Sequence, residues 1–361
     1  MALRKARDEH PTVLGLNGTS LSRGRRVAVT VALCLALGAC GNGEEQTSAD
    51  GMTALTVSTS VPSITTAGAL AMDAQDIDAA HDLDVQFNMA GASSTLSVEA
   101  VLSGDADLAL AGPASILAAM REGAPLTILG STSNNLQVML LRPDVLDRLD
   151  IGPDAPVEER VEALRGLTIG TNPTGSTYQI LLRNELRSFG LNPDEDVTLV
   201  GVQDANALVT GIGQGQFDAV ATSSGVVEQA IVNSGAVVWL SGPRGDVEIT
   251  ADLPVVAMVG RTDWVNENTE TVDKFRDAMA ESLESLRTDR DTLGPVLKNE
   301  YFSAMDQGVW DLAWSESAGG IPDSPTFPRS SFDFWVENDP EGAEAYDDVN
   351  YEDVTYGPAQ D

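Results

Sequence analysis

The sequence predicts an α/β protein made of two similar lobes, each built on largely parallel strands. Two observations support this fold class. Short β-rich runs alternate with helical patterns along most of the chain, and three stretches of the first half recur in the second half. Alternating strands and helices favour parallel sheets, because each strand is followed by a helix that returns the chain to the same end of the sheet.

The alternation begins at residue 55. The run LTVS at 55–58 predicts a strand, residues 67–80 a helix, and LDVQF at 83–87 a second strand. Later in the chain, apolar residues spaced by three or four positions predict a single helix face that packs back on the first lobe. These residues are Val272, Phe275, Met279, Leu283 and Leu286.

The recurrence has a nearly constant offset. LTVST at 55–59 resembles LTIGT at 167–171, and VQF at 85–87 aligns with VTL at 197–199, both 112 residues later. GDADLAL at 104–110 and GQFDAVA at 215–221 lie 111 residues apart. Chance similarity of apolar strands could explain any one pair, but three pairs in one order predict two lobes of the same plan.

The N-terminal sequence predicts that the protein is exported across the cytoplasmic membrane. Three arginines (Arg23, Arg25 and Arg26) precede thirteen uncharged residues at 27–39, which are too few to span a bilayer but suit a signal peptide. The sequence LGAC at 37–40 resembles a bacterial lipobox, which implies cleavage before Cys40 and lipidation of that cysteine. Residues 1–39 are then a signal peptide with an over-long leader; the alternative is a buried helix with an incidental cysteine.

The mature chain is strongly acidic. Removing residues 1–39, with six Lys or Arg and two Asp or Glu, leaves 15 basic and 53 acidic residues. This charge argues against binding to nucleic acid or to anionic lipid through a basic patch. Cys40 is the only remaining cysteine, so an intramolecular disulfide is impossible and core burial must supply the stability.

Two segments flank the predicted fold. Residues 40–52 are polar and predict a lipidated tether, and the folded part is expected from residue 53. Residues 332–361 hold ten acidic and no basic residues, which predicts an acidic extension that is a solvated tail wrapped on the surface rather than a domain. Its first part carries Phe332, Phe334 and Trp335, so we expect that part to dock as a short helix.

The stretch GTNPTGST at 170–177 is one residue short of a phosphate-binding loop, because Ser176 stands where that motif has lysine. Its backbone N–H groups and hydroxyls, at a helix N-terminus, would still hold a singly charged or polar group. Equivalent loops follow the other predicted strands, and helices are expected to open at Ser93, Pro113, Ser176 and Ser223.

Ligands of open α/β sheets bind beyond the carboxyl ends of the strands, so these loops supply the candidate ligand-binding residues. The alternative for each Ser, Thr or Asn is helix capping or turn formation, with which ligand contact is compatible. The candidates are Ser60, Ser93, Ser94, Gly112, Asn134, Asn172, Gly175, Ser176, Thr177, Gln203, Asp204, Thr222 and Ser223.

Several motifs, taken in order, resemble a known family. LTVS at 55–58, AVLSGDADLALAGPA at 100–114, EGAPLTI at 122–128, LRGLTIG at 164–170 and LPVVAMV at 253–259 are similar to extracytoplasmic substrate-binding proteins of ABC importers. The closest branch contains nitrate, sulfonate and taurine binders and binders of thiamine-precursor pyrimidines. The similarity covers roughly residues 53–300.

The resemblance implies the type II periplasmic-binding-protein fold, with two lobes joined by a two-strand hinge. The crossings would fall at LQVMLL, 136–141, and LPVVAM, 253–258. Lobe 1 would then comprise 53–138 and 256–331, and lobe 2 would comprise 139–255. The implied protein is a lipid-anchored monomer on the extracytoplasmic face of the membrane, which passes a small ligand to an ABC permease and its ATPase.

There are two alternatives to this function. One is an enzyme of the pyrimidine-synthase-like branch of this fold, and the other is a ligand-sensing lipoprotein without a transport role. That enzyme branch uses histidine and a cysteine-rich segment, whereas the mature chain has one histidine, His81, and only Cys40. We therefore expect no catalysis, no cofactor and no metal. The candidate loops hold no Lys or Arg, which favours a ligand with at most one anionic group, sulfonate-like or heterocyclic. Asp204 is their only charge and would suit the amine of a zwitterion such as taurine.

Overall fold

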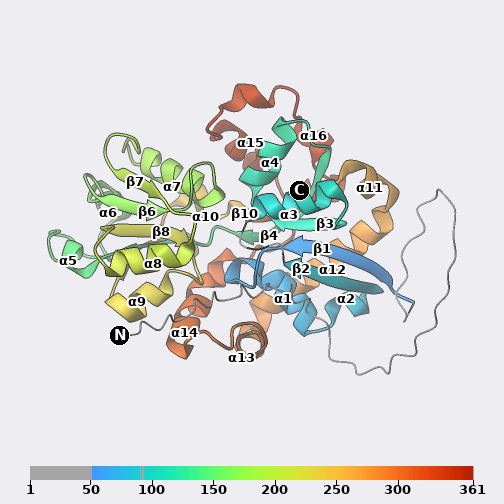
Figure 1. The fold of residues 1–361 in the computed structure, drawn as a ribbon, viewed down its shortest axis with the longest axis horizontal. Coiled ribbons are helices and arrows are strands. Elements are labelled where there is room, and N and C mark those ends of the chain that lie inside the picture. Colours follow the sequence, from blue (N-terminus) through green and yellow to red (C-terminus); the bar gives the residue numbers. More distant parts are fainter. Residues whose placement is uncertain (1–50, 90, 92, 361) are drawn as a thin grey trace, which may run out of the picture.

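The computed structural model describes residues 51–89, 91 and 93–360, and shows two sheets of five strands. Figure 1 places the two sheets side by side, with helices on the faces of each. The predicted signal peptide, Cys40 and the tether as far as residue 50 lie outside the described residues.

Sheet A has the strand order β2-β1-β3-β10-β4. Strand β1 is parallel to β2 and β3, whereas β10 is antiparallel to both of its neighbours, β3 and β4. The strands of sheet A are β1 (Thr53–Thr59), β2 (Leu83–Met89), β3 (Leu108–Ala111), β4 (Leu126–Asn134) and β10 (Pro254–Arg261).

Sheet B repeats this plan in the order β7-β6-β8-β5-β9, with β5 as the antiparallel strand. The register repeats as well, because Leu55 pairs with Val85 and Ile169 pairs with Leu199, thirty residues on in both cases. The internal similarity therefore does mark two lobes of one design. The strands of sheet B are β5 (Gln137–Leu141), β6 (Thr168–Thr171), β7 (Thr198–Gly201), β8 (Ala219–Ser223) and β9 (Val237–Ser241).

The chain crosses between the sheets twice, and the crossings are adjacent. Strand β4 ends at Asn134 and β5 begins at Gln137, while Pro254, at the start of the returning strand β10, pairs with Asn134. Gln137 and Val138 thus belong to sheet B, and residues 254 and 255 to sheet A. The sheets change two residues earlier than the expected lobe boundaries of 138 and 256.

Helices of the first lobe cover both faces of sheet A. The helix expected over 67–80 is broken in two at Asp76, whose backbone has φ of 54°, a left-handed conformation that ends a helix. The five apolar residues of the late amphipathic helix are all buried in α12, as their spacing predicts. The helices are η1 (Ile64–Thr66), α1 (Ala67–Ala74), α2 (Ile77–Ala80), α3 (Ser94–Ser103), α4 (Pro113–Arg121), α11 (Thr262–Glu267) and α12 (Thr269–Thr288).

Helices of the second lobe enclose two smaller apolar clusters, one on each face of sheet B. The expected helix start at Ser223 is wrong, because Ser223 ends β8 and a turn separates it from α9. In that turn the Glu228 carboxylate accepts hydrogen bonds from the Ser224 hydroxyl and the Gly225 N–H, at 2.7 and 2.8 Å. The helices are α5 (Pro143–Leu146), α6 (Val157–Glu162), α7 (Thr177–Ser188), α8 (Ala205–Gly213), α9 (Glu228–Ser234) and α10 (Glu248–Ala251).

The C-terminal segment packs on lobe 1. The predicted docking helix is present as α15, with Phe332 and Trp335 buried, but the segment after it is folded too rather than a solvated tail. Tyr346 and Tyr351 are buried, and the Arg276 guanidinium donates to the carbonyl of Pro358 at 2.7 Å. The elements are α13 (Arg290–Tyr301), α14 (Gln307–Glu316), η2 (Ser317–Gly320), α15 (Arg329–Glu337), η3 (Ala343–Tyr346), α16 (Tyr351–Val354) and η4 (Gly357–Ala359).

Candidate ligand site between the two sheets

The strand directions bring the carboxyl ends of both sheets together. Strands β1 to β4 run one way in sheet A, and β6 to β9 run one way in sheet B. The chain passes from the carboxyl end of β4 to the start of β5 through Asn135 and Leu136 alone, so these two edges face each other. This facing edge is where an open α/β fold binds ligands.

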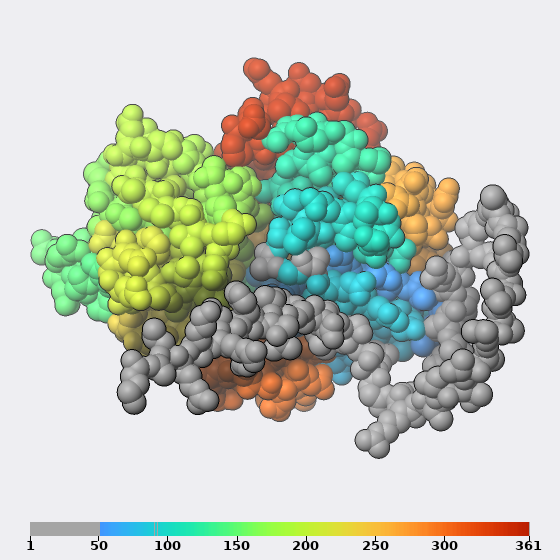
Figure 2. Space-filling view, viewed as in Figure 1, coloured from blue at the N-terminus to red at the C-terminus, as the bar shows by residue number. Residues whose placement is uncertain are grey.

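The lobes touch on both sides of this edge. A Cβ added to Gly112, at the N-terminus of α4, would lie 2.5 Å from Oγ1 of Thr177, at the start of α7. A Cβ on Gly225 would lie 2.9 Å from Cγ1 of Ile64. Figure 2 shows the green and yellow lobe 2 abutting the cyan and blue lobe 1. Gly112 is therefore required for the close approach of the lobes.

One face of sheet B changes from apolar to polar at the edge. Side chains alternate along a strand, so residues two apart share a face. On the face covered by α7, the apolar cluster holds Met139 of β5, Ile169 of β6 and Ala221 of β8. Two positions nearer the edge, the same face carries Gln137, Thr171 and Ser223. We name this set the polar row; Gln137 and Ser223 are directly paired.

Tyr178 of α7 lies against the polar row. The Gln137 side-chain N–H donates to the Tyr178 carbonyl at 2.7 Å. Burial raises the pKa of the Tyr178 phenol, while the nearby Ser223 hydroxyl lowers it by a smaller amount. The phenol oxygen is buried, and it forms no well-formed hydrogen bond among the described residues.

Several other buried polar atoms near the edge also lack hydrogen-bond partners among the described residues. Proteins rarely leave such atoms unpaired, so ordered water or a ligand is expected to satisfy them. The atoms are Ser58 Oγ and Thr59 Oγ1 at the end of β1, Thr132 Oγ1 of β4, Gln137 Oε1 at the start of β5, and Thr171 Oγ1 and Asn172 Oδ1 at the end of β6.

Most of the predicted residues lie along this edge. Ser94 Oγ accepts a hydrogen bond from the Gly112 N–H at 2.9 Å, which joins the loops after β2 and β3. Ser176 caps α7 by accepting from the Gln179 N–H at 3.4 Å. The edge also carries Ser60, Ser93, Asn134, Asn172, Gly175, Thr177 and Ser223.

Three predicted residues are less well placed. Gln203 and Asp204 are exposed after the outer strand β7, and the Asp204 carboxylate caps α8 by accepting from the Asn206 N–H at 2.9 Å. Thr222 is buried, but alternation turns it to the opposite face of sheet B from Ser223. The candidate residues do not include Gln137 and Tyr178, which also lie at this edge. The change from Met139 to Gln137 at one face of a strand end was the available signal.

A buried carboxyl group lies at the hinge. Glu185 of α7 accepts hydrogen bonds from the Thr250 hydroxyl at 2.9 Å and the Asn135 amide at 3.4 Å. Burial raises its pKa to about 7, and the charge of Asp246 adds to that rise, whereas the two hydrogen bonds oppose it. Asn135 lies on the first crossing and Thr250 shortly before the second, so Glu185 ties lobe 2 to both crossings.

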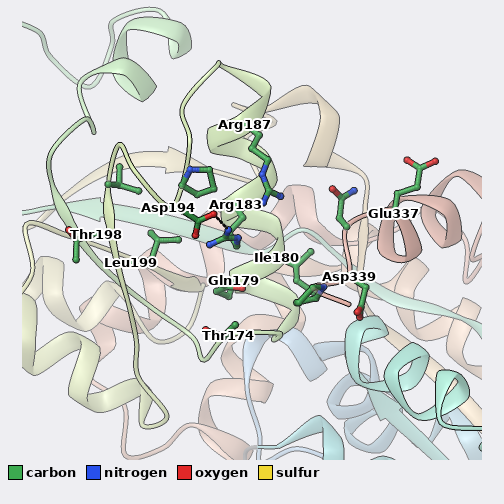
Figure 3. A pocket seen from close by; sticks show the side chains of 14 residues that line it. Thr174, Gln179, Ile180, Arg183, Arg187, Asp194, Thr198, Leu199, Glu337 and Asp339 are labelled. Atoms are coloured by element: carbon green, nitrogen blue, oxygen red, sulfur yellow. Dashed lines mark hydrogen bonds and ion pairs between the residues drawn. The ribbon is translucent and has the colours of Figure 1, made fainter. Parts of the chain in front are cut away.

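A separate cavity of about 710 Å³ lies on the other side of α7. Figure 3 shows Arg183 and Arg187 of α7 opposite Glu337 and Asp339 of the C-terminal segment. Two of these charges have partners: Arg183 donates to Asp194 at 2.6 Å, and Asp339 accepts from Arg121 at 2.7 Å. The volume lies within the range of ligand pockets, but the cavity lacks the mostly apolar lining that such pockets have.

Neither a membrane span nor a metal site is found in the described part of the chain. Within residues 51–360, none of the placed helices is both long and apolar enough to cross a membrane. The same part contains no group of His, Cys, Asp or Glu side chains arranged to hold a metal ion. His81 lies far from the polar row in the fold, pairing with Glu281 of α12 at 2.9 Å.

Two lobes of equal strand order, joined by two adjacent crossings and facing each other with their carboxyl edges, define the type II periplasmic-binding-protein fold. The chain belongs to the NMT1-like family, whose model matches residues 51–292. A search of curated protein sequences finds no significant match.

Solved structures share the fold at low sequence identity. The alkanesulfonate-binding protein SsuA from Xanthomonas axonopodis pv. citri, bound to MOPS, has a TM-score of 0.62 and 16% identity, covering 85% of this chain and 97% of its own. The aliphatic sulphonate-binding protein SsuA from Escherichia coli has a TM-score of 0.58 and 17% identity, covering 74% and 84%. The nitrate-binding protein NrtA from Synechocystis PCC 6803 has a TM-score of 0.56 and 18% identity, covering 73% and 70%.

Proposed function

We propose that the protein is the substrate-binding component of an ABC import system and that it captures a small organic molecule between its lobes. The observation that carries this proposal is the set of buried, unpartnered polar atoms at the facing edges of the two sheets. The family and the binding proteins that share the fold support it.

The ligand is expected to carry at most one anionic group. The loops at the facing edge have hydroxyls, amides and backbone N–H groups but no Lys or Arg, and a multiply charged phosphate is normally met by those cations. Sulfonates and neutral heterocycles both meet this condition. The exposed capping role of Asp204 makes it a weak partner for a ligand amine.

Ligand binding should favour the closed arrangement, because a molecule held by both edges interacts better with that state. A thermal-shift screen of residues 41–361 against nitrate, sulfonates, pyrimidines, amines and carboxylates would find the class. A ligand at about 100 times its Kd adds roughly 2.7 kcal/mol of stability. X-ray scattering with the hit should give a smaller radius of gyration, and an unchanged radius at saturation would refute capture between lobes.

We further propose that Cys40 is lipidated after removal of residues 1–39, which would hold the receptor on the extracytoplasmic face beside its permease. Mass spectrometry of the N-terminal peptide should show a diacylglyceryl cysteine. An uncleaved leader in the membrane fraction would contradict the anchor, though not the binding role.

A receptor that senses its ligand without transport would show the same binding. Uptake of the labelled hit by cells, compared with cells that lack the gene for this chain, separates the two roles. Equal uptake in both would argue against the transport role.

A further inference from the structure

The side chain of Gln137 is held in one orientation. The residue is 3% exposed, and its amide N–H donates to the Tyr178 carbonyl at 2.7 Å. A carbonyl only accepts, so the amide nitrogen must face Tyr178 and the amide oxygen must point the other way. Exchanging the two amide atoms would place two acceptors together.

The backbone of Gln137 is also fixed. Its N–H donates to Oδ1 of Asn135 at 2.8 Å, and its carbonyl accepts from the Gly242 N–H at 2.8 Å. Pairing with Ser223 in the sheet completes the frame. The side chain can therefore not turn aside easily to satisfy its oxygen.

The oxygen of Gln137 is buried and accepts no hydrogen bond from the described residues. It can only accept, whereas the hydroxyls of Thr171 and Tyr178 can both donate and accept. Within the polar row, Gln137 Oε1 therefore requires a hydrogen-bond donor. A ligand that presents only acceptor oxygens to it leaves this atom without a hydrogen bond.

We propose that Gln137 selects the ligand by accepting a hydrogen bond from one of its N–H groups. This inference rests on the proposed function and narrows it: the captured molecule is an amide, an amine or a heterocycle with a ring N–H. Thr171 and Tyr178 supply hydroxyls that adapt to the rest of the polar edge. Simple anions without an N–H, such as nitrate and methanesulfonate, bind poorly.

The test uses pairs of compounds that differ at the N–H group, and it needs no mutation. Taurine is paired with ethanesulfonate, which has no hydrogen-bond donor, and uracil is paired with 1,3-dimethyluracil; nitrate and methanesulfonate are further anions that lack N–H. Calorimetry on residues 41–361 should show binding of at least one N–H compound. Its partner should bind about tenfold more weakly or less, because a buried acceptor would lose its donor.

A variant then assigns the effect to this residue. Gln137→Met keeps the length of the side chain but removes the acceptor, and should weaken the N–H compound about tenfold while leaving its partner nearly unchanged. Gln214→Met, at an exposed position in lobe 2, is the matched control and should bind as the wild type does. Circular dichroism checks that both variants are folded.

Three results would overturn the inference. The first is tight binding of nitrate, methanesulfonate or ethanesulfonate to the wild type, the second is unchanged affinity in a folded Gln137→Met variant, and the third is no binding by any N–H compound of the panel. If an anion without N–H binds and compacts the protein, only the inference about Gln137 is refuted, and the proposed receptor function stands. If no hit of the wider screen compacts the protein, the proposed receptor function is refuted.

Discussion

Helix α7 separates two polar regions that differ in how their groups are satisfied. On one side, the polar row and Tyr178 carry neutral groups, three of which are buried without partners among the described residues. On the other side, the 710 Å³ cavity is lined by charged residues, of which Arg183 and Asp194 pair with each other. We place the proposed ligand site at the polar row rather than in the cavity, because buried polar atoms without partners are rare in proteins.

The difference follows from the three faces of α7. Leu182 and Leu186 pack on sheet B, Tyr178 and Glu185 turn to the hinge, and Arg183 lines the cavity. Glu185 on the hinge side is buried, whereas the Asp194 side chain at the cavity is largely exposed to solvent. Variants on both sides of α7 test this division, in decreasing order of expected effect.

The largest effect is expected where the cavity wall joins the core. Trp335 of α15 is 1% exposed and belongs to the core of lobe 1. Trp335→Ala should cost about 3–5 kcal/mol of unfolding free energy, as large-to-small changes of buried aromatics do. Urea denaturation measures it, with the exposed Glu337→Ala on the same helix as control. A loss below about 1 kcal/mol would mean that the acidic extension is only loosely attached.

The second prediction concerns pH at the hinge. The pKa of Glu185 is about 7 in the folded protein against an ordinary value of 4.5, so the folded form keeps a proton that the unfolded chain has lost. The contribution of this neutral carboxyl group to the free energy of unfolding is therefore complete below pH 4.5. It is lost as the pH rises from 4.5 to about 7.

Glu185→Gln keeps the acceptor for Thr250 but cannot ionise. It should match the wild type near pH 4 and exceed its stability by about 3 kcal/mol at pH 8. Thermal unfolding across this range measures the difference, with the exposed Glu158→Gln as control. Parallel pH profiles for wild type and Glu185→Gln would show that Glu185 is not buried at the hinge.

The third prediction concerns the contact between the lobes. Gly112→Ala would put a Cβ 2.5 Å from Thr177 Oγ1. Relieving that clash should destabilise the closed arrangement of the lobes by about 1–3 kcal/mol. Ligand affinity should fall accordingly, and the radius of gyration should rise. Adding Thr177→Ala should restore much of the affinity, because it removes the clashing atom. Normal ligand binding by the Gly112→Ala single variant would indicate that the lobes do not approach this closely when the ligand is bound.

The smallest effect is expected at the cavity. Arg183→Ala removes the pair with Asp194, whose side chain is largely exposed, so the unfolding free energy should change by about 0–1 kcal/mol. Affinity for the hit of the ligand screen should stay the same. A tenfold or greater loss of affinity would move the ligand site to the cavity side of α7 and reverse the comparison.

Sequence reasoning was strongest where a pattern repeats. Strands β1 and β6 were predicted from a shared motif, and the amphipathic spacing of α12 showed its buried face, because period and apolar character are local properties of the chain. The C-terminal segment was predicted less well. Its negative charge suggested solvent, while its tyrosines and Trp335 pack on lobe 1.

By itself, the sequence determined the fold class, the duplicated plan and the loops that meet at the facing edges, since these follow from local periodicity and strand order. Only the tertiary structure decided which polar atoms are left unsatisfied there. Gln137 belongs to no motif; its proposed role arises because Asn135 of the crossing segment and a carbonyl of α7 meet it at the start of β5. Whether a hydrogen-bonding group is paired depends on neighbours distant in sequence, and folding alone brings them together.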